Sequence, residues 1–159
     1  MAQVVIRHVQ RWLYRSGRPN RLAKVMNAVS SAQFSAGVLA PRNWVTVEVV
    51  GRRSGRTVAF PAVVVEHAGG RYLVSMLGDN TNWVRNVRAA DGHAVLRRRG
   101  RVPVRLDEVE VADRAPILRR YLAAAPGARP HFPVDRHASL TEFRRIADRY
   151  PVFRIVPSS

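Results

Sequence analysis

The spacing of apolar and polar residues changes near residue 40. Between Met1 and Arg15, apolar residues recur every three or four positions, and arginines follow the same period on another face. This is the pattern of an amphipathic helix. Gly17 and Pro19 interrupt it, and a second helical pattern follows between Leu22 and Val29. We therefore predict an N-terminal helical extension over residues 1–40.

From Trp44 onward the pattern is that of β-strands. β-Branched residues dominate residues 44–50 and 57–65, and a glycine-bracketed turn joins these segments into a hairpin. A second turn, Ala68-Gly69-Gly70, closes the next hairpin, so we expect the first three strands to form an antiparallel meander. We predict six strands in all, over residues 44–50, 57–65, 71–76, 93–98, 101–111 and 151–156.

Helix signals separate the later strands. Asp79 or Asn80 is placed to cap a helix before the fourth strand, and Asp113 a helix after the fifth. Ser139 and Glu142 have the spacing of a capping box for the last helix. Strands joined by short hairpins, without βαβ alternation, favour a small antiparallel barrel. We therefore predict an α+β fold that is mainly antiparallel β, with a barrel domain over residues 41–159.

The amino-acid composition limits the possible binding partners of the protein and its cellular location. The formal net charge is +16, and no acidic residue precedes Glu48, so we expect an anionic partner: nucleic acid, a membrane surface or a small molecule. There is no cysteine, and the five histidines are not closely paired, so we predict no metal site. No apolar run approaches the roughly 20 residues of a membrane span, and no signal-peptide hydrophobic region is present, which predicts a cytoplasmic protein.

The N-terminal helices allow two interpretations. Residues 1–30 carry a basic stripe beside an apolar one, which is typical of docking on an anionic lipid surface. The protein would then be peripheral on the inner face of the membrane. In the other interpretation the apolar stripe packs on the barrel of the same chain and the arginines are solvated.

Two arginine-rich turns differ in their surroundings. Residues 51–56 read Gly-Arg-Arg-Ser-Gly-Arg between two predicted strands, which indicates an anion site at a hairpin tip. Residues 97–101 read Arg-Arg-Arg-Gly-Arg, and we interpret them as a solvated hairpin without a functional role.

Several motifs follow one another in a specific order: Gly51 to Gly55, Pro61 in the second strand, Ser75 to Gly78 after the third, Asn82 to Ala89, and the closing segment Tyr150 to Pro157. Over residues 40–157 this combination resembles the deazaflavin-dependent nitroreductase and quinone reductase family. The resemblance implies a six-stranded split β-barrel of the FMN-binding-like type, with flanking helices.

This resemblance also implies a function. It is that of an oxidoreductase that binds reduced coenzyme F-420, an 8-hydroxy-5-deazaflavin, and transfers a hydride from its C5 to a small organic acceptor such as a quinone or nitro compound. Ser75 is the candidate catalytic residue. The implied cofactor-binding residues are Arg52, Arg53, Ser54, Gly55, Pro61, Ser75, Met76, Leu77, Gly78, Asn82, Trp83 and Asn86.

Other functions remain open at this point. A basic barrel that binds nucleic acid or another anion without catalysis would explain the net charge, although no strand alternates aromatic and basic residues as a stacking platform would, which makes nucleic acid unlikely. A split barrel that uses FMN in place of the deazaflavin is a further alternative. The sequence does not indicate the physiological acceptor or the oligomeric state.

Overall fold

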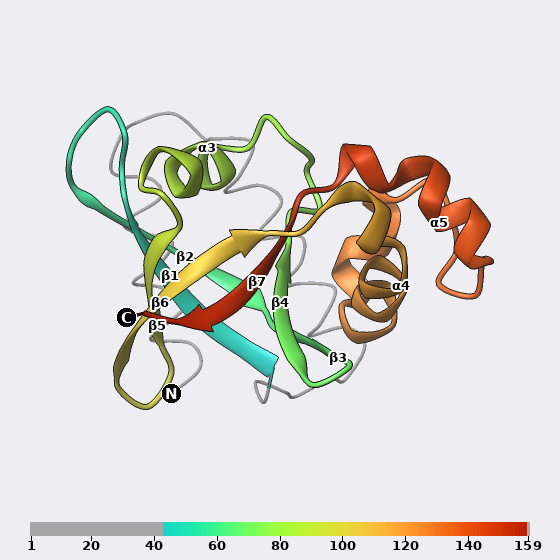
Figure 1. The fold of residues 1–159 in the computed structure, drawn as a ribbon, viewed down its shortest axis with the longest axis horizontal. Coiled ribbons are helices and arrows are strands. Elements are labelled where there is room, and N and C mark those ends of the chain that lie inside the picture. The colour runs from blue at the N-terminus through green and yellow to red at the C-terminus, as the bar shows by residue number, and fades with distance from the viewer. Residues whose placement is uncertain (1–42, 159) are drawn as a thin grey trace.

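One antiparallel sheet forms the frame of the molecule (Figure 1). The computed structural model describes residues 43–158. The predicted helical extension and its membrane docking thus lie outside the described residues. The strands are β1 (Trp44–Val50), β2 (Thr57–Val63), β3 (Val65–His67), β4 (Gly70–Val74), β5 (His93–Arg97), β6 (Arg101–Glu108) and β7 (Val152–Pro157).

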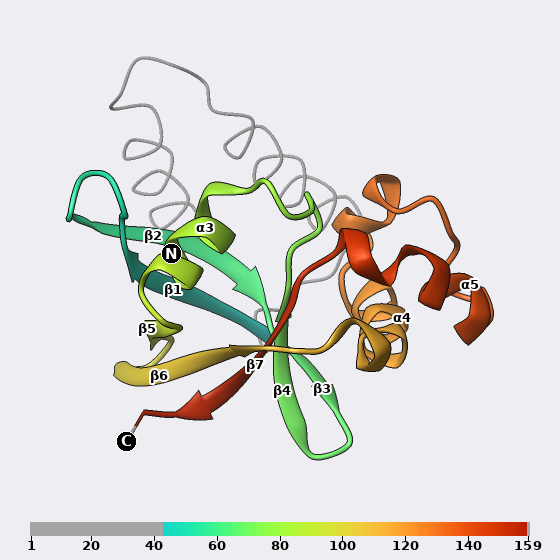
Figure 2. The same ribbon diagram turned by 45° about the horizontal axis from the view of Figure 1, so that its top comes forward.

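The strand order is β2-β1-β5-β6-β7-β4-β3, so β2 and β3 are the two edges of the sheet. Only Val64 separates these edge strands along the chain. The sheet must therefore curl until its edges lie near each other, which makes it a split barrel, as Figure 2 shows. The prediction of a mainly antiparallel barrel is confirmed.

The predicted number of strands was wrong, because residues 57–65 form two strands. β2 pairs with β1, whereas β3 pairs with β4. Between them the Val64 N–H donates a hydrogen bond to the Asn43 carbonyl at 2.6 Å, and there the chain passes from one edge to the other. Both predicted hairpins are present, β1–β2 and β3–β4, but they do not form one continuous meander, because β4 pairs with β3 and β7 and not with β2.

The helices lie near their predicted positions, but two caps differ. Helix α3 (Asn82–Ala89) begins after Thr81, and α4 (Ala115–Ala124) begins after Arg114. The Asp79 carboxylate does not cap because it accepts a hydrogen bond from Arg88 at 2.8 Å. Asp113 instead lies in a short 3-10 helix. The 3-10 helices are η2 (Val111–Asp113), η3 (Pro126–His131) and η4 (Ala147–Arg149).

The capping box of the last helix is confirmed. Helix α5 (Leu140–Ile146) begins after Ser139, whose hydroxyl accepts a hydrogen bond from the Glu142 N–H at 3.2 Å. The Glu142 carboxylate in turn accepts one from the Ser139 N–H at 3.0 Å. Two orphan donors of the first turn are satisfied in this way.

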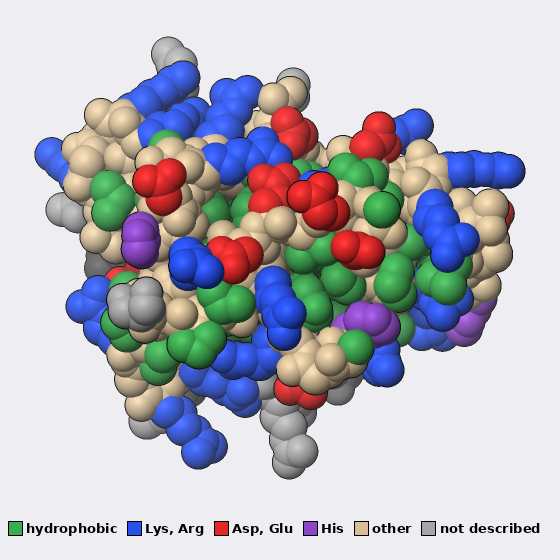
Figure 3. All heavy atoms as spheres, in the orientation of Figure 1, with side chains coloured by type: hydrophobic (Ala, Val, Ile, Leu, Met, Phe, Trp, Pro, Cys, Tyr) green, Lys and Arg blue, Asp and Glu red, His purple; other side chains and the backbone are tan. Residues whose placement is uncertain are grey.

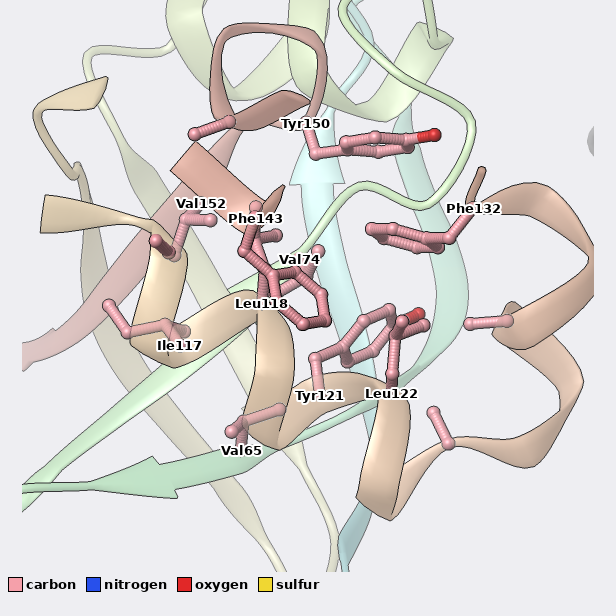
Figure 4. Close-up of a cluster of buried hydrophobic side chains, with 14 of the residues drawn as sticks. Val65, Val74, Ile117, Leu118, Tyr121, Leu122, Phe132, Phe143, Tyr150 and Val152 are labelled. Carbon is pink, nitrogen blue, oxygen red and sulfur yellow. The ribbon is translucent and has the colours of Figure 1, made fainter. Parts of the chain in front are cut away.

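Two hydrophobic cores stabilise the fold. The first fills the barrel, and α3 closes one end of it with Trp83, Val84 and Val87. The second lies between the outer face of β3, β4 and β7 and the helices α4 and α5; Figure 4 shows its centre, with Leu118 and Phe143 fully buried. Alternation along β4 and β7 sends side chains to both cores: Leu73 and Phe153 to the first, Val74 and Val152 to the second.

Residues 43–158 contain neither a membrane-spanning helix nor a cluster of metal ligands. Within them, no helix combines the length and the apolar character that a membrane span requires. In the same part of the chain, no three His, Asp or Glu side chains gather in an arrangement able to hold a metal ion.

Candidate cofactor site

The basic turn between β1 and β2 is closed by its own backbone. The Gly51 N–H donates to the Arg56 carbonyl at 2.8 Å, and the Gly55 N–H donates to the Gly51 carbonyl at 2.9 Å. Gly55 has a φ of +69°, in the left-handed region where glycine carries no steric penalty. The Arg53 and Arg56 side chains are exposed. The turn thus holds cationic groups in solvent on a defined backbone.

Asn86 attaches this turn to helix α3. Its buried side-chain oxygen accepts a hydrogen bond from the Arg52 N–H at 3.1 Å and another from the Arg52 guanidinium at 2.9 Å. One amide therefore fixes both the backbone and the side chain of Arg52. The sequence resemblance implies that Asn86 binds the cofactor, and this role stays a prediction; in the structure its side-chain oxygen holds Arg52.

A shallow pocket lies at the split of the barrel, beside β2, which is an edge strand of the sheet that residues 43–158 form. Pro61 lies on this edge strand, where its missing N–H breaks no ladder hydrogen bond. The pocket volume is about 60 Å³. The pocket is lined by Trp44, Phe60, Pro61, Ala62, Val63, Val74, Met76, Leu77, Trp83 and Tyr121.

Trp83 connects the pocket with the part of α3 that holds the basic turn. Its ring stacks on Phe60 at a centroid distance of 5.1 Å and is tilted against Phe153 at 5.5 Å. Trp83 and Asn86 are three residues apart on one helix, a rise of about 4.5 Å. The apolar pocket and the fastened arginine therefore border the same short, rigid element.

The loop after β4 is organised by hydroxyl groups. The Ser75 hydroxyl donates to the Gly78 carbonyl at 2.7 Å and lies 3.1 Å from the Thr81 hydroxyl. Gly78 has a φ of +89°, and a Cβ there would lie 3.2 Å from the Arg149 carbonyl oxygen. Ser75 is 1% exposed. These contacts give Ser75 a place in the fold of the loop; its predicted catalytic role stays a prediction.

Buried Arg114 supports the same loop from behind. Its guanidinium donates to the carbonyls of Ala147 and Val109 and to the Glu108 carboxylate, at 3.1, 2.9 and 3.1 Å. These contacts hold η4, and directly after η4 the Pro151 carbonyl accepts a hydrogen bond from the Ser75 N–H at 2.9 Å. The position of the loop is therefore tied to the C-terminal segment.

Acidic side chains near α3 are paired with arginine. Arg88 contacts both Asp79 and Glu108 at 2.8 Å, and Figure 3 shows acidic side chains gathered in this area among basic ones. Hydrogen bonding from Arg88 lowers the pKa of the Asp79 carboxyl below its usual value. Arg88 thus compensates the charge of both carboxylates.

The structure brings the predicted residues together in two groups. Pro61, Met76, Leu77 and Trp83 line the pocket. Arg52, Arg53, Ser54 and Gly55 form the turn that Asn86 holds. Two of the remaining three, Ser75 and Gly78, shape the loop behind the pocket, while Asn82 is exposed at the first position of α3.

Six residues that line the pocket were not predicted as site residues: Trp44, Phe60, Ala62, Val63, Val74 and Tyr121. Tyr121 is the one with a hydroxyl group. It lies on α4, far from the other motifs in sequence, and is 5% exposed. Burial raises the pKa of its phenol well above the usual value. Its ring packs near Phe132, which stacks on Tyr150 at 4.0 Å (Figure 4). Tyr121 lies on the buried face of α4. The packing of α4 against the barrel brings its side chain to the pocket.

The chain is similar to known proteins in structure. No family model matches the sequence, and no curated protein matches it. The structure of an F-420-H2-dependent reductase (FDR-A) aligns with 72% of this chain and 94% of its own length, at 25% identity and a TM-score of 0.48. A domain-swapped dimer aligns with 83% of this chain and 93% of its own, at 20% identity and a TM-score of 0.50.

A third solved structure extends the comparison. A protein of unknown function from Agrobacterium tumefaciens aligns with 74% of this chain and 49% of its own, at 14% identity and a TM-score of 0.52. The last two alignments support the fold alone. The first of these aligned structures carries the name of an F-420-dependent reductase, the kind of protein that the sequence resemblance names.

Proposed function

We propose that this protein is an oxidoreductase that binds reduced coenzyme F-420 and transfers a hydride to a small organic acceptor. The observation that carries the proposal is the arrangement around α3. Asn86 fastens the arginine of the basic turn to this helix, and Trp83 of the same helix forms a wall of the apolar pocket. One element thus joins a site for anions to a site for a flat apolar group.

The residues present fit the two parts of this cofactor. Its tail carries a phosphodiester and carboxylates, which guanidiniums recognise through paired, charge-assisted hydrogen bonds. Arg52 and Arg53 would hold it, with the Gly55 amide open to close approach. The enclosed volume of about 60 Å³ is too small to surround a three-ring system. The ring would therefore lie against the open side of the pocket, on Pro61, Met76 and Trp83.

When bound, the reduced deazaflavin would supply the hydride, so the protein is required to bind, orient and stabilise charge. Among the described lining residues, Tyr121 is the one with a hydroxyl. Because burial raises its pKa, the phenol stays protonated at neutral pH. It would donate a hydrogen bond to an acceptor oxygen that gains negative charge.

The first experiment is a titration of the protein with coenzyme F-420 at about 150 mM salt, where exposed charges more than ~8 Å apart are largely screened. We expect saturable, stoichiometric binding, and weaker binding of FMN, which lacks the oligoglutamate tail. Absence of saturable binding would remove the proposal. Tighter binding of FMN would mean that FMN is the cofactor and that it binds at the same site.

Arginine variants test the anion end. Arg52→Ala should weaken coenzyme binding about tenfold or more, since a charge-assisted contact contributes about 1.5 to 3 kcal/mol. Arg145→Ala is the matched control, an exposed arginine on α5, and should leave the affinity unchanged. Equal losses from both variants would favour a diffuse electrostatic surface, as expected for nonspecific nucleic-acid binding.

Tyr121→Phe tests the acceptor side once a substrate is in hand. We expect a lower kcat with unchanged coenzyme affinity. The pH profile of the wild-type protein should be flat through neutral pH, because a phenol with a raised pKa keeps its proton beyond the ordinary value of about 10. A kcat unaffected by the loss of the hydroxyl would exclude this role.

A further inference from the structure

A larger pocket lies at the end of the barrel opposite α3. Its volume is about 290 Å³, and its floor is apolar, formed by Val45, Val64 and Leu96 of the barrel core. In Figure 1 the tips of the β3–β4 and β5–β6 hairpins lie at the bottom and α3 at the top. Helix α3 thus closes one end of the barrel, while the other end opens between these two tips.

Strand alternation divides the second arginine-rich turn between two faces. Leu96 and Val104 point into the barrel, so Arg97 and Arg101 point outward. Both outward arginines pair with Glu48, at 3.1 and 2.6 Å. Arg98 and Arg99 instead line the mouth of the pocket. All five residues of the turn are exposed, as the sequence predicted, but their arginines have different partners.

The rim of this pocket has an excess of positive charge. Arg71, Arg98 and Arg99 line it together with one carboxylate, Glu66. Glu66 lies directly across from Arg71 in the β3–β4 register, as close as side chains of neighbouring strands come. Within the described residues, none of the three arginines forms an ion pair. Two guanidiniums at the hairpin tip are thus available to an anion.

The mouth also exposes an apolar side chain. Val102 is 57% exposed at its edge, the most exposed large hydrophobic side chain described in residues 43–158. An apolar path therefore leads from the surface, past the arginines, to the buried floor. This order of groups matches a ligand with an anionic head and a hydrocarbon chain.

We propose that this end of the barrel binds a free medium-chain carboxylate. The carboxylate would lie between Arg98 and Arg99, where a guanidinium can donate two parallel hydrogen bonds. The chain would lie on Val45, Val64 and Leu96. At ~30 Å³ for each group, a volume of about 290 Å³ admits about ten non-hydrogen atoms. Octanoate has this size. The site is separate from the proposed cofactor site and does not depend on it.

The test is an NMR titration of the cofactor-free, full-length protein with sodium octanoate at about 150 mM salt. We expect saturable shifts of the amides of Leu96, Gly100 and Val102, with those of the basic turn at 51–56 unchanged. Two matched probes separate the contributions. Octan-1-ol has the hydrocarbon chain without the charge, and inorganic sulfate has the charge without the chain. The proposal is overturned if either binds as tightly as octanoate, or if octanoate gives no saturable shift below its micelle concentration.

Variants at exposed positions locate the site without threatening the fold. The double variant Arg98→Gln and Arg99→Gln should weaken octanoate about tenfold or more and leave octan-1-ol unchanged. Val102→Asp, which adds a negative charge at the mouth, should weaken octanoate by a similar factor. Arg56→Gln, an exposed arginine on the other hairpin tip, should have no effect. Equal weakening by Arg56→Gln would show a surface effect of charge and refute the site.

Discussion

The two arginine-rich hairpin turns resemble each other in sequence but differ in what holds them. In the first, between β1 and β2, the half-buried Arg52 is bound by a neutral amide, Asn86, on a helix of the barrel core. In the second, between β5 and β6, Arg97 and Arg101 pair with the buried carboxylate of Glu48. A neutral partner leaves the charge of the first turn intact, whereas a carboxylate cancels part of the charge of the second.

This difference shows that a positively charged turn does not always have guanidinium groups available to bind a ligand. An arginine that is oriented by an amide oxygen keeps its full charge and its remaining donors for a ligand. Ion-paired arginines mainly hold the hairpin, and only those whose side chains point away from the carboxylate remain for binding. Net charge alone, +16 for the chain, does not distinguish these cases.

The largest effect is expected from a change in α3, the helix to which the first turn is attached. Trp83→Ala deletes a side chain that is 7% exposed and packs on Phe60 and Phe153. We expect a loss of about 3 to 5 kcal/mol in the free energy of unfolding, because a buried aromatic leaves a cavity. Val102→Ala, beside the second turn, should change it by less than about 0.5 kcal/mol. Denaturant unfolding measures both, and a small loss for Trp83→Ala would contradict the close packing of α3 on the barrel core.

Much of this comparison was within reach of the sequence. Residues 51–56 combined glycine, serine and arginine between β-branched segments, and local turn chemistry correctly predicted a hairpin tip there. The capping box at Ser139 was predicted for the same reason, since both partners lie within one turn of helix. Features that depend on a few neighbouring residues could therefore be read from the sequence.

Features that depend on distant segments could not. The break at Val64 arises from a hydrogen bond to Asn43 and from pairing with β4, and a continuous β-branched segment carries no signal of either. Asn86 is joined to Arg52 across 34 positions, and Tyr121 reaches the pocket only through the packing of α4. These three features depend on burial and on contacts between residues far apart in the sequence.

Asn86→Ala tests the attachment of the first turn directly. It removes the acceptor of two hydrogen bonds from Arg52, and we expect a loss of about 2 kcal/mol in stability and faster exchange of the Arg52 amide proton. Asn80→Ala is the control, because Asn80 is exposed and accepts one surface hydrogen bond from Arg85. It should cost less than about 0.5 kcal/mol. Equal effects would mean that Asn86 is not a special attachment point.

The glycines of the two turns should differ in their tolerance of a side chain. Gly55 has a φ of +69°, and Gly100 a φ of +149°; a Cβ would meet no atom within 4 Å at either position. Only backbone strain is therefore at issue. Gly55→Ala should cost about 1 kcal/mol, and Gly100→Ala about 2 kcal/mol, because its φ lies in a region essentially confined to glycine. Thermal unfolding of both variants gives the order, and the reverse order would contradict it.

The smallest effect is expected where the second turn meets Glu48. The carboxylate is buried, at 6% exposure, but the side chains of Arg97 and Arg101 are 52% and 66% exposed. Glu48→Gln keeps the shape and a hydrogen-bond acceptor, and the released guanidiniums can turn to water, so we expect a loss below about 1 kcal/mol. The difference from wild type should shrink further in about 1 M salt, where screening is strong. A loss above about 2 kcal/mol that persists in salt would mean that the ion pairs act as buried ones. The second turn would then be held at least as firmly as the first, and availability of charge, rather than strength of attachment, would be the remaining difference between them.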